Sequence, residues 1–179
     1  MKVKTTEHIT ERKDIITIRG NPVTLVGSEL KIGDKAPDFT VLDGDLNETG
    51  LKDFTERVKV ISVATSLDTP ICYMQTKKFD QRAAELPDDI ALLTVTMDLP
   101  FAISLFRASA GIDKIQTFSD HRHASFGNAY GVLIKELRLL ARSIFIIDRD
   151  DIVRYREVVP ELTNYYNEEK IFRYVKKLI

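Results

Sequence analysis

The sequence predicts an α/β fold, with a central mixed β-sheet flanked by helices and an added N-terminal β-hairpin. Residues 58–64 and 91–98 are runs rich in β-branched side chains, and a helical stretch at 69–86 separates them. This strand–helix–strand order predicts two parallel strands joined by a right-handed crossover. Residues 142–159 hold two β-rich runs around an Arg-Asp-Asp turn, and residues 15–27 hold two more around Gly-Asn-Pro. Both segments therefore predict hairpins.

The remaining elements follow from local signals along the chain. A helix is predicted from 98 to 108, because Asp-Leu-Pro opens it and Gly111 is placed to end it. A strand near 115–118 and a polar loop at 119–127 follow. The stretch at 167–179 is amphipathic and predicts a closing helix.

The composition predicts one soluble, cytoplasmic domain and favours small neutral or weakly charged partners. The chain has 179 residues, of which 44% are hydrophobic, and this is enough for one ordinary core. Its 26 basic and 27 acidic residues include no basic block of the kind that binds nucleic acid or a membrane surface. We expect a polar N-terminal extension at 1–14, without an apolar targeting or membrane-spanning segment, and a single domain at 15–179.

The single cysteine, Cys72, lies where the 69–86 helix begins. Thr69 is a favourable N-cap and Pro70 a favourable first helical residue, which puts Cys72 at the third helical position. Free amides and the positive end of the helix dipole favour a thiolate there. Helical spacing places Cys72 on one face with Phe79 and Ala83, so the sulfur is expected to point inward. Because cysteine is often only a small buried hydrophobe, position alone supports packing and nucleophilic roles equally.

The segment "VKVISVATSLDTPICYMQTKKF" resembles the active-site segment of the thiol peroxidases, the atypical two-cysteine branch of the peroxiredoxins. The blocks "GNPVTLVG", "MDLPFA", "SDHR", "SFGNAYGVLIKELRLLAR" and "VVPELT" also resemble that family, in its order. The resemblance covers most of the chain and implies a thioredoxin-like fold with an added N-terminal hairpin. It also implies a homodimer.

The family motif is Pro-x-x-x-Thr-x-x-Cys, completed by a distant arginine. The resemblance implies that Cys72 is the peroxidatic cysteine, that Thr69 holds the sulfur and polarises the peroxide, and that Arg142 supplies a fixed cation. Thr65 stands where the motif has proline, and Arg122 lies in the "SDHR" block. We expect both at the substrate-binding site, although a plain loop role for Arg122 is equally supported.

The resolving cysteine of the two-cysteine members is also absent, because Arg107 takes its aligned position and the chain has no other cysteine. An intramolecular disulfide is therefore impossible. The sulfenic acid formed at Cys72 must be reduced by an external thiol, either of low molecular weight or in a thioredoxin-type protein. The resemblance thus predicts a one-cysteine thiol peroxidase that reduces hydrogen peroxide and organic hydroperoxides.

Two other functions stay open at this point. A redox sensor would keep the reactive thiolate and pass its oxidation to a partner, whereas a non-catalytic relative would keep only an interaction surface. No cofactor is expected, and no metal, since His121 and His123 supply too few ligands. On the 98–108 helix, Phe101, Leu105 and Phe106 are expected in the core, with a substrate pocket or a dimer surface as alternatives.

Overall fold

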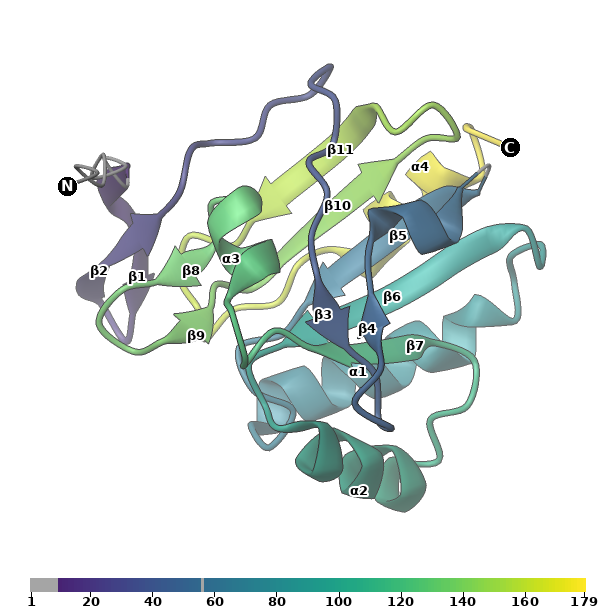
Figure 1. Cartoon of the computed structure of the whole chain (residues 1–179), viewed down its shortest axis with the longest axis horizontal. Helices are drawn as coiled ribbons and strands as arrows, with labels where there is room; N and C mark the ends of the chain where they lie inside the picture. Colours follow the sequence, from purple (N-terminus) through teal and green to yellow (C-terminus); the bar gives the residue numbers. More distant parts are fainter. Residues whose placement is uncertain (1–9, 56) are drawn as a thin grey trace, which may run out of the picture.

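The computed structural model describes residues 10–55 and 57–179, and its centre is a mixed seven-stranded sheet (Figure 1). The strand order is β11-β10-β5-β6-β7-β3-β4. The strands are β3 (Val41–Leu42), β4 (Glu48–Thr49), β5 (Val58–Val63), β6 (Ile90–Thr96), β7 (Gln116–Ser119), β10 (Ser143–Ile147) and β11 (Val153–Val158). The parallel β5–β6 pair and the antiparallel β10–β11 hairpin confirm the predicted core of the fold.

The predicted N-terminal hairpin is present and belongs to a second, four-stranded sheet. Its strands, in the order β1-β2-β8-β9, are β1 (Glu11–Ile18), β2 (Asn21–Val26), β8 (Leu133–Ile134) and β9 (Leu139–Leu140). Since β1 begins at Glu11, the end of the predicted polar extension is part of the hairpin. Residues 1–9 lie outside the described part of the chain.

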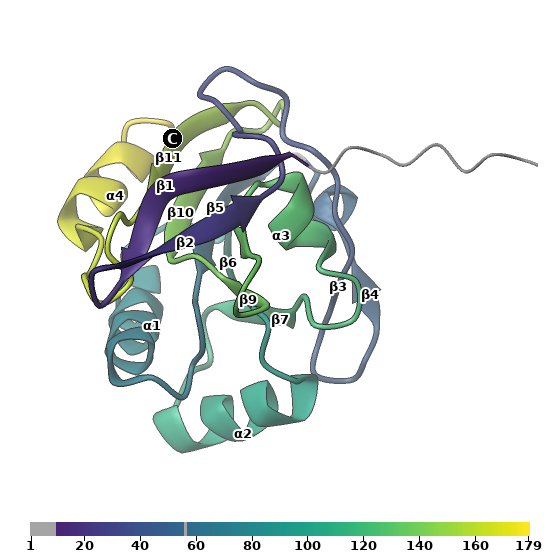
Figure 2. The same ribbon diagram turned by 90° about the vertical axis from the view of Figure 1, so that its left-hand side faces the viewer.

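Helices cover both faces of the central sheet. Figure 2 shows α1 and α4 on one side of the strands and α3 on the other. The helices are η1 (Leu51–Phe54), α1 (Pro70–Ala83), α2 (Pro100–Ala110), α3 (Ser125–Ala129) and α4 (Glu168–Val175). Apolar side chains of α1, α2 and α4 pack together on one face, while the hairpin and α3 enclose a second core on the other. The layers are those of a sheet buried on both faces.

The sheet register brings distant parts of the sequence to one place. Ser143 of β10 pairs with Val63 of β5 in an antiparallel ladder. Continuing this register places Arg142, just before β10, beside Ala64, just after β5. The loop from Ala64 into α1 lies at the carboxyl end of a parallel strand, where functional residues of α/β sheets commonly gather.

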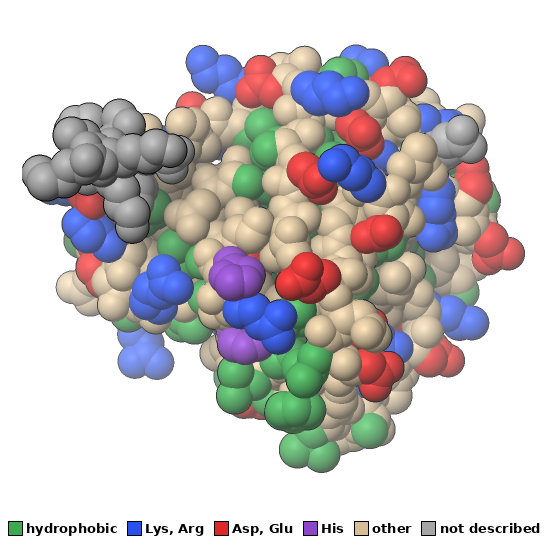
Figure 3. Space-filling model, in the orientation of Figure 1, with side chains coloured by type: hydrophobic (Ala, Val, Ile, Leu, Met, Phe, Trp, Pro, Cys, Tyr) green, Lys and Arg blue, Asp and Glu red, His purple; other side chains and the backbone are tan. Residues whose placement is uncertain are grey.

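Two local predictions were wrong. Residues 119–127 were predicted as a loop, but they include the start of α3, whose first amides are bound by the buried Asp120. Phe101 and Leu105 were expected in the core, yet they are 68% and 73% exposed, and only Phe106 is buried. On one side of α2 the apolar stripe therefore faces solvent, and Figure 3 shows apolar side chains gathered over this helix.

The described residues include no helix that is both long and apolar enough to cross a membrane.

Candidate active site

The first turn of α1 presents Cys72 to the interior. Thr69 has an extended backbone, Pro70 is the first helical residue and Cys72 the third, as predicted. The cysteine is 2% exposed and packs with Phe79 in the core of this face. The hydrogen bond made by the Thr69 hydroxyl differs from the one predicted for an N-cap residue. It donates to the carbonyl of Ser66 at 2.8 Å and does not cap a helix amide.

Arg142 is the nearest cation to the sulfur. Its Nη2 donates to Cys72 Sγ at 3.0 Å. Its Nη1 donates to the carbonyl oxygens of Leu162 and Asn164, the second at 2.6 Å. Arg142 is 2% exposed, so its charge acts at short range in a poorly solvated site. A guanidinium fixed at this distance stabilises a thiolate relative to a thiol.

A cavity of about 570 Å³ opens beside this pair. It is lined by Ile18, Arg19, Asn21, Thr65, Thr69, Pro70, Ile71, Arg142, Leu162 and Thr163. Most of the lining is apolar, but Thr65 Oγ1 and Arg142 Nε are buried there without a hydrogen-bond partner in the described part of the chain. Because buried polar groups are normally paired, these two unpaired atoms make the cavity a candidate site for a small polar ligand.

Asp98 anchors the loop that carries Thr65 and Thr69. Its carboxylate accepts hydrogen bonds from Ser66 Oγ at 2.8 Å, the Leu67 amide at 2.7 Å and a threonine hydroxyl of β6. Asp98 was not among the site residues predicted from the sequence. Its place directly after a strand parallel to β5 was the available signal, because the carboxyl ends of neighbouring parallel strands meet.

A buried polar cluster lies behind the cysteine. Tyr166 Oη and Ser62 Oγ are 2.9 Å apart, and Gln75 Nε2 approaches the Tyr166 carbonyl at 3.4 Å. Burial raises the pKa of Tyr166 above its usual range, so its hydroxyl stays protonated. This cluster supports the first turns of α1 without adding a charge beside Cys72.

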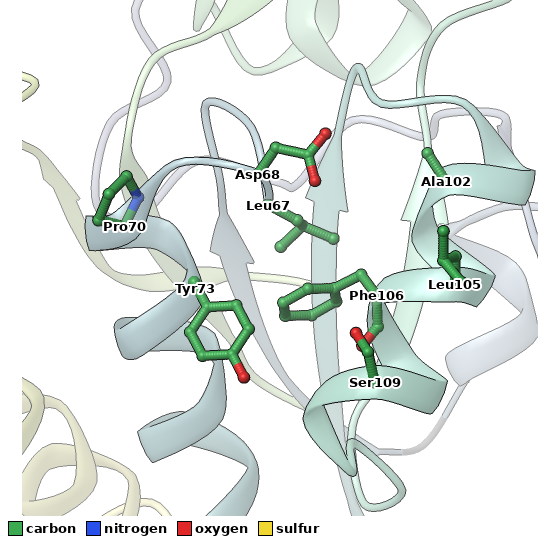
Figure 4. A pocket seen from close by; sticks show the side chains of 8 residues that line it. All are labelled: Leu67, Asp68, Pro70, Tyr73, Ala102, Leu105, Phe106 and Ser109. Carbon is green, nitrogen blue, oxygen red and sulfur yellow. The ribbon is translucent and has the colours of Figure 1, made fainter.

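A second hollow, of about 350 Å³, lies on the other side of the α1 first turn, between α1 and α2 (Figure 4). Tyr73 and Phe106 line it and pack against each other, with ring centroids 5.5 Å apart in an edge-to-face arrangement. Arg107, at the position expected for a resolving cysteine, donates from α2 to Ile115 O at 3.2 Å and Thr117 Oγ1 at 3.3 Å. This arginine links α2 to the strand that follows it.

The structure brings Cys72, Thr69, Arg142 and Thr65 together, but not Arg122. Arg122 does not line the cavity of about 570 Å³; it is exposed and lies 3.6 Å from Glu48. The reason is its position after β7, which β6 separates from β5 in the sheet. The histidines flanking it, His121 and His123, lie at the surface shown in Figure 3.

Comparison with known proteins places this chain in a family. A family model described as Redoxin matches residues 31–175. A thiol peroxidase of Bacillus subtilis is 51% identical over 164 residues, which are 92% of this chain and 98% of that protein. A thiol peroxidase of Halalkalibacterium halodurans is 52% identical over 161 residues, or 90% and 96% of the two chains. A peroxiredoxin-like protein from Aquifex aeolicus superimposes with a TM-score of 0.87 at 41% identity, covering 96% of this chain and 99% of that chain.

The chain therefore belongs to the redoxin family, and its thioredoxin-like peroxiredoxin fold is confirmed. Within that family it belongs with the thiol peroxidases, which makes it an oxidoreductase.

Proposed function

We propose that this protein reduces hydrogen peroxide and organic hydroperoxides by a one-cysteine mechanism, with Cys72 as the nucleophile. The observation that carries the proposal is the 3.0 Å contact between Arg142 Nη2 and Cys72 Sγ beside a largely apolar cavity. A thiolate, unlike a thiol, is a nucleophile, and the adjacent guanidinium favours it.

In the proposed first step the Cys72 thiolate attacks one peroxide oxygen, so that an S–O bond forms and the O–O bond breaks. The sulfur is oxidised to sulfenic acid, and the other oxygen leaves and takes a proton from solvent to become water or an alcohol. Arg142 stabilises the negative charge that develops on the departing oxygen. The Thr69 hydroxyl donates its hydrogen bond to the Ser66 carbonyl, so its oxygen lone pairs are available to accept a hydrogen bond from the peroxide.

Thr65 is proposed as a substrate-binding residue. Its hydroxyl is buried in the cavity wall, and no partner for it exists among residues 10–55 and 57–179. A hydrogen bond to a bound peroxide would satisfy this group.

The second half of the reaction requires an external thiol, because the chain has one cysteine. A first thiol condenses with the sulfenic acid, which releases water and leaves a mixed disulfide on Cys72. A second thiol then displaces the Cys72 thiolate and carries away the disulfide. Both a low-molecular-weight thiol and a thioredoxin-type protein can carry out these two steps. Neither step needs a resolving cysteine, whose aligned position is occupied by Arg107.

A homodimer and a cytoplasmic location complete the proposal. The exposed side chains of Phe101 and Leu105 on α2 are apolar surface that a second copy would bury. Sedimentation velocity tests the dimer, with Phe101→Glu as the variant expected to shift the protein toward monomer.

The proposed function is tested by steady-state peroxide consumption with dithiothreitol and, separately, with a thioredoxin system. Wild-type protein is expected to turn over many times, Cys72→Ser is expected to be inactive, and a sulfenic-acid trap is expected to add to Cys72 after one equivalent of peroxide. Peroxide consumption that survives Cys72→Ser would contradict the proposal.

A redox sensor is the second candidate, and the burial of Cys72 favours it. A sulfur that is 2% exposed is shielded from a large reductant once it is oxidised. Fast first oxidation followed by turnover slower than one event per minute with every thiol tested would support the sensor, whereas a Cys72 as unreactive as a free thiol would support a non-catalytic relative.

A further inference from the structure

The carboxylate of Glu161 joins the tip of the N-terminal hairpin to the segment that follows β11. Its Oε2 accepts hydrogen bonds from Thr17 Oγ1 at 2.7 Å and from the Gly20 amide at 3.0 Å. Its Oε1 accepts from the Arg19 amide at 3.0 Å, and from the amide and hydroxyl of Thr163 at 3.0 and 2.8 Å. One side chain therefore collects five donors from two segments of the chain.

The hairpin turn is shaped to present its amides to this carboxylate. Arg19 and Gly20 form a two-residue turn with φ angles of 51° and 78°, so both are in the left-handed region. Consecutive amides in a tight turn form a concavity that suits an anion. The accepted hydrogen bonds hold the pKa of Glu161 well below its usual range, which keeps the carboxylate charged.

Main-chain hydrogen bonds extend the same junction. The Thr17 amide donates to the Pro160 carbonyl at 2.7 Å, and the Leu162 amide donates to the Thr17 carbonyl at 2.9 Å. These hydrogen bonds hold the hairpin and the 160–164 segment together, so that the two form one continuous side of the cavity. Ile18 and Asn21 from the hairpin and Leu162 from the segment all line the cavity beside Cys72.

The 160–164 segment also holds Arg142. The carbonyl oxygens of Leu162 and Asn164 both accept from Arg142 Nη1, one residue before and one after Thr163, whose amide and hydroxyl bind Glu161. With Nη1 fixed in this way, Nη2 is directed at Cys72 Sγ. A shift of the segment would move the guanidinium away from the sulfur.

We propose that Glu161 is a positioning residue: its carboxylate fixes the hairpin tip and the 160–164 segment together, and thereby sets Arg142 against Cys72. The inference rests on the proposed function for its catalytic meaning. It assigns Glu161 no contact with the substrate.

The test compares Glu161→Gln with Glu136→Gln. Glu136 also binds the hairpin, since its carboxylate accepts from the Thr24 amide at 2.9 and 3.2 Å, but it touches neither Arg142 nor the cavity. Two quantities are measured for each variant: the second-order rate constant for peroxide oxidation of Cys72, and the pH profile of Cys72 alkylation by iodoacetamide.

We expect Glu161→Gln to lower the oxidation rate constant about tenfold, the size of one impaired hydrogen bond to a charged group. The midpoint of the alkylation profile should move to higher pH, because Arg142 no longer favours the thiolate. Glu136→Gln should change neither quantity. Glu161→Asp keeps the charge on a shorter side chain, so both its oxidation rate constant and its alkylation midpoint should lie between those of wild type and Glu161→Gln. If Glu161→Gln does not fold, Glu161→Asp replaces it in the test.

The proposal fails if Glu161→Gln lowers only the unfolding free energy and leaves both quantities unchanged, or if Glu136→Gln has an equal effect on them. The alkylation profile keeps this test separate from the proposed function. A wild-type Cys72 that reacts slowly with peroxide would overturn the function, yet a shifted alkylation profile in Glu161→Gln alone would still support the positioning role.

Discussion

The two hollows beside the first turn of α1 share Pro70 but differ in chemistry. The wall of the cavity on the hairpin side holds two buried polar atoms that have no partner among residues 10–55 and 57–179, Thr65 Oγ1 and Arg142 Nε. The hollow on the α2 side is closed by the paired rings of Tyr73 and Phe106. Unsatisfied polar groups mark a place for a ligand, whereas paired aromatic rings mark packing. This difference supports the proposal that the chemistry of this protein takes place on the hairpin side.

Arg107 on α2 and Arg142 in the wall of the hairpin-side cavity show the same contrast. Arg107 donates to Ile115 and Thr117, which lie at and just before the start of the strand after α2, and so holds these elements together. Arg142 is held by carbonyl oxygens through one nitrogen and keeps another for Cys72. The residue at the position where the resemblance led us to expect a resolving cysteine thus links α2 to the next strand.

The largest expected effect separates these arginines. Arg142→Ala should lower the rate constant for oxidation of Cys72 by hydrogen peroxide by about 100-fold or more, the usual loss when one preorganised donor is removed. Arg107→Ala should leave the rate constant unchanged and lower the unfolding free energy by about 1 kcal/mol. Stopped-flow oxidation and urea unfolding measure the two quantities. Equal rate losses in both variants would remove the contrast between the two sides.

A smaller loss of oxidation rate is expected when the Thr69 hydroxyl is removed. Ser109 provides a matched control, because each of the two hydroxyls donates to the carbonyl three residues earlier. Thr69 donates to the carbonyl of Ser66, and Ser109, in the other hollow, donates to the carbonyl of Phe106. Thr69→Val should lower the oxidation rate constant about tenfold, because the peroxide loses a hydrogen-bond acceptor. Ser109→Ala, the matched control, should not change it. A normal rate in Thr69→Val would show that the hydroxyl does not touch the peroxide.

A still smaller effect tests the unpartnered hydroxyl of Thr65. Thr65→Val should lower the oxidation rate constant about threefold, near the low end for one neutral hydrogen bond. Thr94 is the control, since its hydroxyl is also buried without a partner among the described residues but lies within β6. Thr94→Val is expected to keep the wild-type rate. If the two valine variants behave alike, the Thr65 hydroxyl does not bind substrate.

Substitution of Asp120, on the opposite face of the sheet, is expected to leave the oxidation rate constant unchanged. The titration of this carboxyl should instead change the free energy of unfolding. Burial raises the pKa of Asp120 to about 6, against the partial offset of amide hydrogen bonds from Phe126 and Gly127. The folded protein thus takes up a proton more readily than the unfolded chain, so this stabilisation is complete below pH ~4 and lost as the pH rises through about 6.

Urea unfolding of wild type and Asp120→Asn at several pH values checks this sign. Relative to the variant, wild type should gain about 1.4 kcal/mol of unfolding free energy between pH ~7.5 and pH ~5. A difference that stays constant over this range, or that shrinks toward acid, would contradict the assignment.

Much of the fold was predictable because long elements carry strong patterns. The β-branched runs of β5 and β6 and the Pro-led starts of α1 and α2 are all found where the sequence placed them. The two-residue strands β3, β4, β8 and β9 were not foreseen, because so few residues show no periodicity. The exposure of Phe101 and Leu105 was also missed, since an apolar stripe does not reveal whether a neighbour covers it.

The site was predictable where the chemistry lies in single residues. Cys72, Thr69 and Arg142 were assigned from their motif, and the structure brings them together. Asp98 and Glu161 were missed, because their roles depend on partners up to about 140 residues away in the sequence, as in the contact between Glu161 and Thr17. Such partners become visible only once the hairpin and the central sheet are assembled.

The most direct test of the account is the rate at which one equivalent of hydrogen peroxide oxidises Cys72, followed across pH by trapping the sulfenic acid. We predict oxidation far faster than that of a free thiol at neutral pH. Oxidation no faster than that of a free thiol would contradict the claim that Arg142 and Cys72 form a peroxide-reducing centre.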